Sequence, residues 1–215
     1  MSDDGVTVLV PGGRDVRGTL DRADGRTPDG DPAADTGAGA CVVACPPHPQ
    51  HRGHRGDARL RAVGDRLTDR GVDCLRFDYG DWDEGYGERA DVERAVEWAR
   101  ERYARVGLFG FSFGGCLSLV VAGDAAGDDL AAVSALAPAA RIASDLDAVA
   151  AMDGVDCPGQ VVYGARDDTA DWEPVVDRAR ELEWSPIELA ADHFFVGQNE
   201  QVADAAGGFL AERLR

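Results

Sequence analysis

Short apolar runs alternate with longer amphipathic stretches along most of this 215-residue chain. An apolar run of about four to eight residues bounded by Gly, Pro or Asp predicts a buried strand, whereas apolar positions three and four residues apart predict a helix. Single helices between strands indicate an α/β fold with a mostly parallel sheet of about eight strands and helices on both faces. The expected strands are 7–11, 17–23, 40–45, 72–79, 105–111, 130–138, 159–165 and 185–191, and the expected helices are 57–70, 88–104, 113–123, 144–152, 173–184 and 199–214.

The length predicts a single domain over residues 1–215, because the chain is long enough for one substantial core and too short for two. The strands expected at 7–11 and 17–23 should form an antiparallel pair. Residues 24–39 follow, and they are rich in Asp, Gly, Pro and Ala. This composition predicts a flexible, solvated loop before the alternating part of the fold begins.

The charge balance is strongly acidic. All 22 basic residues are arginine, and 40 Asp and Glu residues give a net charge of −18. This balance excludes a nucleic-acid partner, whose phosphates require a positive face. Molar salt shortens the Debye length to about 3 Å and screens the self-repulsion, so the charge favours a halophilic protein. A GC-rich genome is the alternative reason for the missing lysine, but it does not account for the excess of carboxylates.

The sequence indicates a cytoplasmic protein. Its start, MSDDGVTVLVPGG, has no basic region followed by an apolar one, and no apolar run approaches the roughly 18 residues that span a bilayer. Five cysteines are an odd number and favour reduced thiols. Cys41 and Cys45 share one face of an expected strand, about 13 Å apart, which is too far for a disulfide.

The salt-adapted interpretation makes a direct prediction. Raising KCl from about 0.1 M to about 2 M should raise the midpoint of thermal unfolding. The carboxylates repel one another more strongly in the compact folded state than in the unfolded chain, and salt screens this repulsion. Differential scanning calorimetry over a KCl series measures this shift. An unchanged or falling midpoint would exclude the halophilic interpretation.

A Gly-x-Ser-x-Gly motif, Gly110-Phe111-Ser112-Phe113-Gly114, lies where the strand 105–111 turns into a helix. A serine on such a sharp turn stands above the carboxyl edge of the sheet, and the small residues on either side leave room for the bend. The helix that follows presents free N–H groups and a positive dipole to developing negative charge. The motif therefore predicts that Ser112 is a nucleophile.

An acid and a histidine follow the serine in the order that such a nucleophile requires. Asp167 stands just past the strand 159–165, with Asp168 as the competing acid. His193 lies after the last expected strand, and it is the only histidine downstream of Ser112. Because parallel strands end at one edge of the sheet, these positions predict a Ser-His-Asp triad.

At this point the chain resembles the α/β-hydrolase superfamily, in particular small lidless members similar to the dienelactone-hydrolase-like and HPHP-motif hydrolases. The resemblance runs from about residue 40 to the end, and it is carried by PPHPQHRG, RFDYGDWDEGYGERAD, GFSFGG, GARDD and DHFFVG. It implies that Ser112 attacks an acyl carbon, His193 moves the proton and an acid orients the histidine. The Gly-x-x-Asp spacing from Gly164 favours Asp167 over Asp168.

The resemblance also implies an oxyanion hole and an open site. The N–H of Phe113, next to the nucleophile, should supply one donor. Pro46, Pro47 and Pro49 have no N–H, so Gln50 is the first available donor in the other loop. Only 139–157 separate two neighbouring strands, which leaves room for one helix and no cap domain.

Histidines at even spacing follow Cys45 in the same loop, at His48, His51 and His54. Structural zinc sites draw ligands from two separated pairs, and a single proline-rich decapeptide offers none. We therefore expect no metal site, with His48 bracing the loop and the other two exposed. An adventitious or regulatory metal site is the alternative.

Several residues are candidates for substrate binding. Arg52 replaces the first glycine of the Gly-Gly pair in related sequences and is placed to bind a carboxylate, which favours acidic esters or lactones; its alternative is an ordinary surface arginine. The candidate walls are aromatic and are equally compatible with core positions. They are Phe113, Trp82, Tyr86, Phe194 and Phe195.

These observations predict a serine hydrolase that cleaves a small ester, thioester or lactone through an acyl-enzyme. The chemistry requires no cofactor, and the expected partner is a small-molecule acyl substrate, with neither a membrane nor a nucleic acid involved. Two alternatives are an acyltransferase that uses the same serine and a non-catalytic scaffold that acts as a binding module. The physiological substrate and the oligomeric state stay open.

Overall fold

The computed structural model describes residues 5–23, 39–124 and 129–215. The loop predicted at 24–39 lies, apart from its last residue, outside the described residues. The main sheet has eight strands in the order β1-β2-β4-β3-β5-β6-β9-β10. These strands are β1 (Val6–Val10), β2 (Val16–Asp21), β3 (Ala40–Cys45), β4 (Asp73–Asp78), β5 (Arg105–Phe111), β6 (Ala132–Leu136), β9 (Gly159–Gly164) and β10 (Ile187–Leu189).

The predicted pairing of the strands is confirmed. β2 pairs antiparallel with β1 and with β4, while every other neighbouring pair in the sheet is parallel. The central strand β3 is buried along its whole length, and β5 is buried from its second residue onward. Their near-continuous apolar runs reflect this burial, because parallel strands with helices on both faces have no side turned to water.

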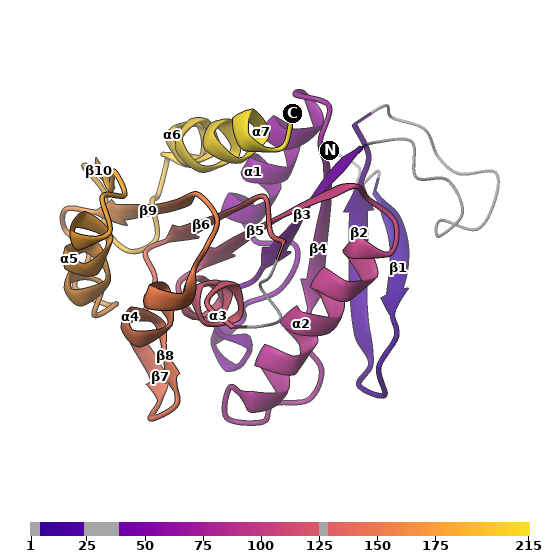
Figure 1. The fold of residues 1–215 in the computed structure, drawn as a ribbon, viewed down its shortest axis with the longest axis horizontal. Helices are drawn as coiled ribbons and strands as arrows, with labels where there is room; N and C mark the ends of the chain where they lie inside the picture. The colour runs from indigo at the N-terminus through magenta and orange to yellow at the C-terminus, as the bar shows by residue number, and fades with distance from the viewer. Residues whose placement is uncertain (1–4, 24–38, 125–128) are drawn as a thin grey trace.

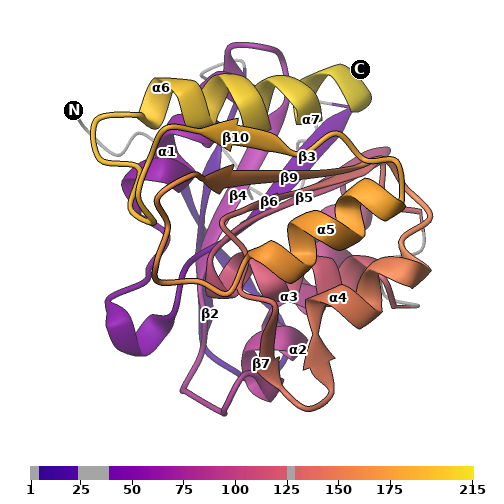
Figure 2. The same ribbon diagram turned by 90° about the vertical axis from the view of Figure 1, so that its left-hand side faces the viewer.

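Helices cover both faces of the sheet, as predicted (Figure 1). α2, α3, α4 and α5 lie on one face, and α1, α6 and α7 lie on the other; Figure 2 shows α5 and α6–α7 on opposite sides of β9 and β10. A separate apolar core fills each interface. The helices are α1 (Ala58–Thr68), α2 (Tyr86–Arg100), α3 (Phe113–Ala122), α4 (Ala148–Ala151), α5 (Glu173–Glu181), α6 (Asn199–Val202) and α7 (Gly208–Arg213), with a π-helical turn (Ala203–Gly207) between the last two.

The segment between β6 and β9 differs from the single helix predicted at 144–152. It begins with a short antiparallel hairpin, β7 (Arg141–Ala143) and β8 (Leu146–Asp147), and α4 starts only afterwards. The Asp147 carboxylate accepts the Ala150 N–H at 3.0 Å, so this side chain fixes the first turn of α4. The described residues of this segment contain no cap domain, as predicted.

No helix in the described part of the chain combines the length and apolarity needed to cross a bilayer. All five cysteines are free thiols, and four of them are buried. Burial raises the pKa of the Cys116 thiol to about 12, so this thiol stays protonated near neutral pH.

Candidate active site

The turn at Ser112 is a strained backbone position between β5 and α3. Ser112 has φ 57° and ψ −114°, a backbone conformation that residues other than glycine rarely adopt. A Cβ on Gly110 would lie 2.0 Å from the Gly114 carbonyl oxygen, and one on Gly114 would lie 2.4 Å from the Cys45 and Pro46 carbonyl oxygens. Both glycines of the motif are therefore required by close backbone contacts, and together they join this turn to the end of β3.

Three side chains from distant parts of the chain form one hydrogen-bonded series. Ser112 Oγ lies 3.0 Å from His193 Nε2, and His193 Nδ1 lies 2.7 Å from Asp167 Oδ2. His193 is 5 % exposed and Asp167 is 8 % exposed. Burial of the ring and the carboxylate keeps this series out of competition with water, while the serine oxygen remains partly accessible.

The Asp167 carboxylate is held in place from its other side. Its Oδ1 accepts the N–H groups of Thr169 at 2.9 Å and Ala170 at 3.1 Å, which leaves Oδ2 for the imidazole. Asp168, the competing acid, is exposed, and its carboxylate lies 3.5 Å from the Thr169 hydroxyl. The geometry thus joins Asp167, and not Asp168, to His193.

The two expected oxyanion donors differ in their surroundings. Phe113 is the first residue of α3, so its N–H has no acceptor within the helix. The Gln50 N–H instead donates to His48 Nδ1 at 3.2 Å, at the start of the 3₁₀ turn Pro49–His51. The Phe113 donor is available in this structure, whereas the Gln50 donor is engaged in a long local hydrogen bond.

The histidine-rich loop is organised by ring packing. The His48 ring lies 4.6 Å from that of His51, 4.7 Å from Trp82 and 4.8 Å from Phe113. Burial, and then the nearby His51, lowers the pKa of His48. His48 therefore packs between the 3₁₀ turn Pro49–His51 and Phe113, the residue that follows Ser112.

The same loop does not gather metal ligands. The His54 Nδ1 accepts the Gly56 N–H at 3.0 Å, and Cys45 is buried in the core, where burial raises the pKa of its thiol well above its ordinary value. Within residues 5–23, 39–124 and 129–215, no three His, Cys, Asp or Glu side chains are arranged to hold a metal ion.

Arg52 adopts a left-handed conformation, with φ 66° and ψ 22°, at the end of the 3₁₀ turn. This is a conformation that glycine adopts without strain, in agreement with the Gly-Gly pair expected at this point from the resemblance. The Arg52 side chain is exposed. Arg52 therefore places an exposed cation on the loop at a backbone position that favours glycine.

The aromatic candidates differ in how far they lie from Ser112 and His193. Trp82 packs against His48 and lies 5.9 Å from the Phe113 ring, while Phe194 is 54 % exposed with its ring edge-on to His193 at 5.4 Å. Tyr86 is exposed and donates its hydroxyl to Asp145 at 2.7 Å, which ties α2 to the β7–β8 turn.

Phe195 is fully buried and packs against Phe111, so it belongs to the core and not to a wall of the site. The difference between the two neighbouring phenylalanines arises because the backbone turns at Phe195, which has φ 48°.

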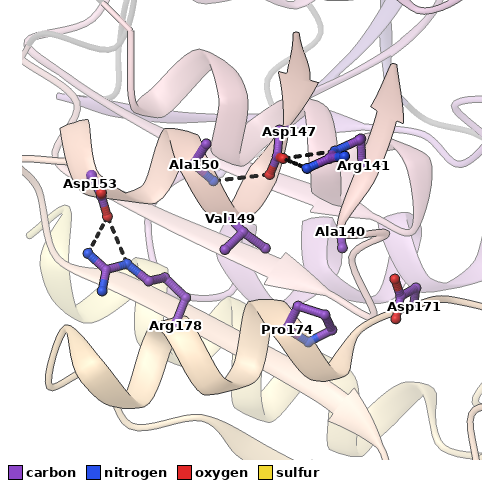
Figure 3. Close-up of a pocket in the computed structure, with 9 residues that line it drawn as sticks. All are labelled: Ala140, Arg141, Asp147, Val149, Ala150, Asp153, Asp171, Pro174 and Arg178. Atoms are coloured by element: carbon purple, nitrogen blue, oxygen red, sulfur yellow. Dashed lines mark hydrogen bonds and ion pairs between the residues drawn. The ribbon is translucent and has the colours of Figure 1, made fainter. Parts of the chain in front are cut away.

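A hollow of about 550 Å³ lies between α4, α5 and the β7–β8 hairpin (Figure 3). Backbone hydrogen bonds connect its lining to the turn at Ser112. The Ala140 N–H donates to the Asp171 carbonyl at 3.1 Å, and the Ala139 N–H donates to the Ser112 carbonyl at 3.4 Å. Its charged side chains pair with one another: Arg141 Nε lies 2.8 Å from Asp147, and Arg178 Nε lies 2.7 Å from Asp153 (Figure 3). The hollow therefore combines two charged pairs with apolar side chains such as Val149 and Pro174. Its lining residues are Ala140, Arg141, Asp147, Val149, Ala150, Asp153, Asp171, Pro174 and Arg178.

The rim loop, residues 79–85, is held by two buried carboxylates near the start of α2, Glu88 and Asp91. Glu88 accepts the N–H groups of Asp83 at 3.0 Å and Gly85 at 2.8 Å, and Asp91 accepts the Gly80 N–H at 2.9 Å.

A cation from another part of the chain balances these two charges. Arg14, in the β1–β2 turn, donates to Asp91 at 2.9 Å and lies 3.8 Å from Glu88, while Arg94 lies 3.7 Å from Asp91. Because both carboxylates are fully buried, this charge balance fixes the path of the loop that carries Trp82.

Replacing Arg14 with methionine should remove the cation beside Glu88 and leave Asp91 with Arg94, on the same helix, as its ion-pair partner. We expect a loss of about 3 kcal/mol in the free energy of unfolding, the size typical of a buried pair broken on one side. Urea denaturation measures the loss, and Arg17→Met, at an exposed position of β2, is the matched control. A loss below about 1 kcal/mol for Arg14→Met would show that the network does not hold the loop.

Known protein structures provide the comparison for this fold and site. No family model and no curated protein matched the chain. A serine hydrolase without a lid from Xanthomonas campestris, XC6422, superposes with a TM-score of 0.73 and 22 % identity over 100 % of this chain and 95 % of the other. Est1E from Butyrivibrio proteoclasticus gives a TM-score of 0.80 and 17 % identity over 98 % and 99 %. Dienelactone hydrolase from Anabaena variabilis gives 0.71 and 21 % over 98 % and 97 %.

These similarities cover 98–100 % of the chain and include a hydrolase without a lid, in agreement with the lack of a cap domain among the described residues. The chain therefore has the α/β-hydrolase fold, and the predicted fold class and the resemblance in architecture are confirmed. At these identities the comparisons establish architecture, and the chemistry has to be argued from the side chains.

Proposed function

We propose that this protein is a serine hydrolase that cleaves a small ester, thioester or lactone through an acyl-enzyme intermediate. The observation that carries the proposal is the hydrogen-bonded series from Ser112 Oγ through His193 to Asp167 on a strained strand-to-helix turn. A nucleophile, a base within hydrogen-bond reach and a third group that orients the base are the parts that acyl transfer requires.

Each side chain has one role in this mechanism. His193 Nε2 removes the Ser112 proton as the oxygen attacks the carbonyl carbon, and Asp167 stabilises the resulting imidazolium through Nδ1. The imidazolium then gives its proton to the leaving group, and the acyl group stays on Ser112. Water attacks this ester with His193 again acting as base, which releases the acid and restores the serine.

The negative charge on the carbonyl oxygen is assigned to two backbone donors. The Phe113 N–H stands at the amino end of α3, where the helix dipole also favours an anion. Gln50 would be the second donor, exchanging its 3.2 Å hydrogen bond to His48 for a shorter one to the oxyanion.

The walls of the site favour a compact acyl group with a planar part. Trp82 and Phe194 are the proposed walls, and Arg52 is exposed on the oxyanion loop, where it is available to an anionic substituent. Tyr86 is assigned to the outer rim through its contact with Asp145. Est1E has been solved with ferulic acid bound, so an ester of an aromatic acid belongs in the first substrate panel.

The setting follows from the charge and from the chemistry. With a net charge of −18, we assign the protein to a salt-rich cytoplasm and to small-molecule substrates, without a nucleic-acid or membrane partner. The proposed reaction uses the protein's own groups together with water, and it calls for no cofactor.

Two neighbouring carboxylates allow a matched test of the proposed roles. Asp167→Asn should lower kcat for a hydrolysed ester by about 10⁴-fold, because the amide no longer orients and stabilises the imidazolium. Asp168→Asn should leave kcat within about threefold of the parent, since its carboxylate is exposed. Initial rates at high salt against acetate, lactone, thioester and ferulate substrates, with Ser112→Ala as the blank, measure both effects. Equal losses in the two variants, or parent rates equal to the blank on every substrate, would contradict the proposal.

A further inference from the structure

His193 stands in a loop without regular secondary structure, between β10 and α6, so its position has to be set by contacts with other elements. The first part of this loop is tied to the loop after β9, because the Arg166 N–H donates to the Ala191 carbonyl at 2.9 Å. The part just after the histidine is tied elsewhere: the Phe194 carbonyl accepts a hydrogen bond of 2.7 Å from Arg59 Nη1. A side chain of α1 therefore holds the residue next to the proposed base.

The Arg59 guanidinium is fixed before it reaches the loop. Its Nε donates to Asp57 Oδ1 at 2.8 Å, and its Nη2 pairs with the other oxygen of the same carboxylate. Asp57 also accepts the Arg59 backbone N–H at 2.9 Å and so begins α1. The two side chains are only 17 % and 10 % exposed, so the helix start and the guanidinium form one rigid unit.

The same guanidinium also contacts the nucleophile side of the site. Arg59 Cζ lies 4.5 Å from the centroid of the Phe111 ring, and Phe111 is the residue that precedes Ser112. The Phe111 ring in turn lies 5.3 Å from the His193 ring. One planar cation thus contacts the residue before the proposed nucleophile and the residue after the proposed base.

We propose that Arg59 is a positioning residue that sets the spacing between Ser112 and His193. The inference rests on the proposed function, and it adds a residue from outside the Ser-His-Asp series. Arginine suits this place because its planar group stacks on a ring, binds a carboxylate with two N–H groups and still has a donor for a carbonyl. Lysine has no plane to stack and is a single point charge, so it retains only part of this set of contacts.

Arg59→Met should lower kcat on the order of 10-fold to 100-fold with little change in KM, because a small displacement of the base slows the chemical step more than it weakens substrate binding. Arg59→Lys should recover part of the loss, since its ammonium can still donate to the Phe194 carbonyl. Arg66→Met is the matched control, because Arg66 lies on the same helix and pairs with Asp204. Rates are compared at equal concentrations of folded protein, established by the thermal transition of each variant at the same salt concentration.

A second measurement does not depend on turnover. The His193 Nδ1 proton, hydrogen-bonded to Asp167 at 2.7 Å, should give a downfield NMR resonance in the parent and in Arg66→Met that broadens or disappears in Arg59→Met. A kcat within twofold of the parent together with an unchanged resonance would overturn the role of Arg59. Absence of any hydrolysis by the parent would instead contradict the proposed function, and the resonance would then decide the role of Arg59 alone.

Discussion

The proposed active site depends on one backbone constraint, the reversal of the chain at Ser112 with φ 57°. A non-glycine residue adopts this conformation at a cost of about 1–3 kcal/mol, and surrounding contacts must offset it. The Ser112 N–H donates to the Leu136 carbonyl at 2.8 Å, and all ten residues of α3 are buried. The absence of side chains at Gly110 and Gly114 lets α3 approach the ends of β5 and β3. The strained turn is therefore held by a fully buried helix and by the ends of two buried strands, which fix the direction of the Ser112 side chain.

The parallel sheet supplies the rest of the geometry. Ser112 and His193 are 81 residues apart, yet they meet because β5 and β10 belong to one parallel set and end at the same edge. The loops beyond those ends are irregular, and each is fixed by charged or polar contacts: Asp167 by two backbone N–H groups, the rim loop by Glu88 and Asp91, and the histidine loop by Arg59. Several of these groups are buried, so salt screens their interactions less than it screens those of exposed pairs.

Much of this fold can be predicted from the sequence, because apolar residues recur at the positions that the sheet and helices bury. The strands lie within two residues of their expected ends, since each apolar run stops where the chain leaves the sheet. The juxtaposition of Ser112, Asp167 and His193 is expected for the same reason. The Gly-x-x-Asp spacing from Gly164 also favours Asp167 over its neighbour, and in the structure Asp167 is the carboxylate that lies beside His193.

The contacts that could not be predicted are those between loops and between side chains distant in the sequence. Arg59 binds a carbonyl 135 residues away, and Arg14 balances carboxylates at 88 and 91; neither position is marked by a local pattern. The even spacing of the histidines does not predict how their side chains are arranged. In the structure the His48 and His51 rings stack, and the Gln50 N–H donates to His48. The helix expected at 144–152 starts late because a hairpin and the Asp147 cap take its first residues.

The central claim is that Ser112 is a nucleophile activated by His193, and covalent labelling tests it most directly. Intact-mass spectrometry of the protein treated with a fluorophosphonate at high salt, followed by peptide mapping, measures the number and the position of modified residues. The account predicts one adduct per chain, located on Ser112, and none in Ser112→Ala or His193→Ala over the same time. An unmodified parent protein, or an adduct that persists in Ser112→Ala, would contradict it.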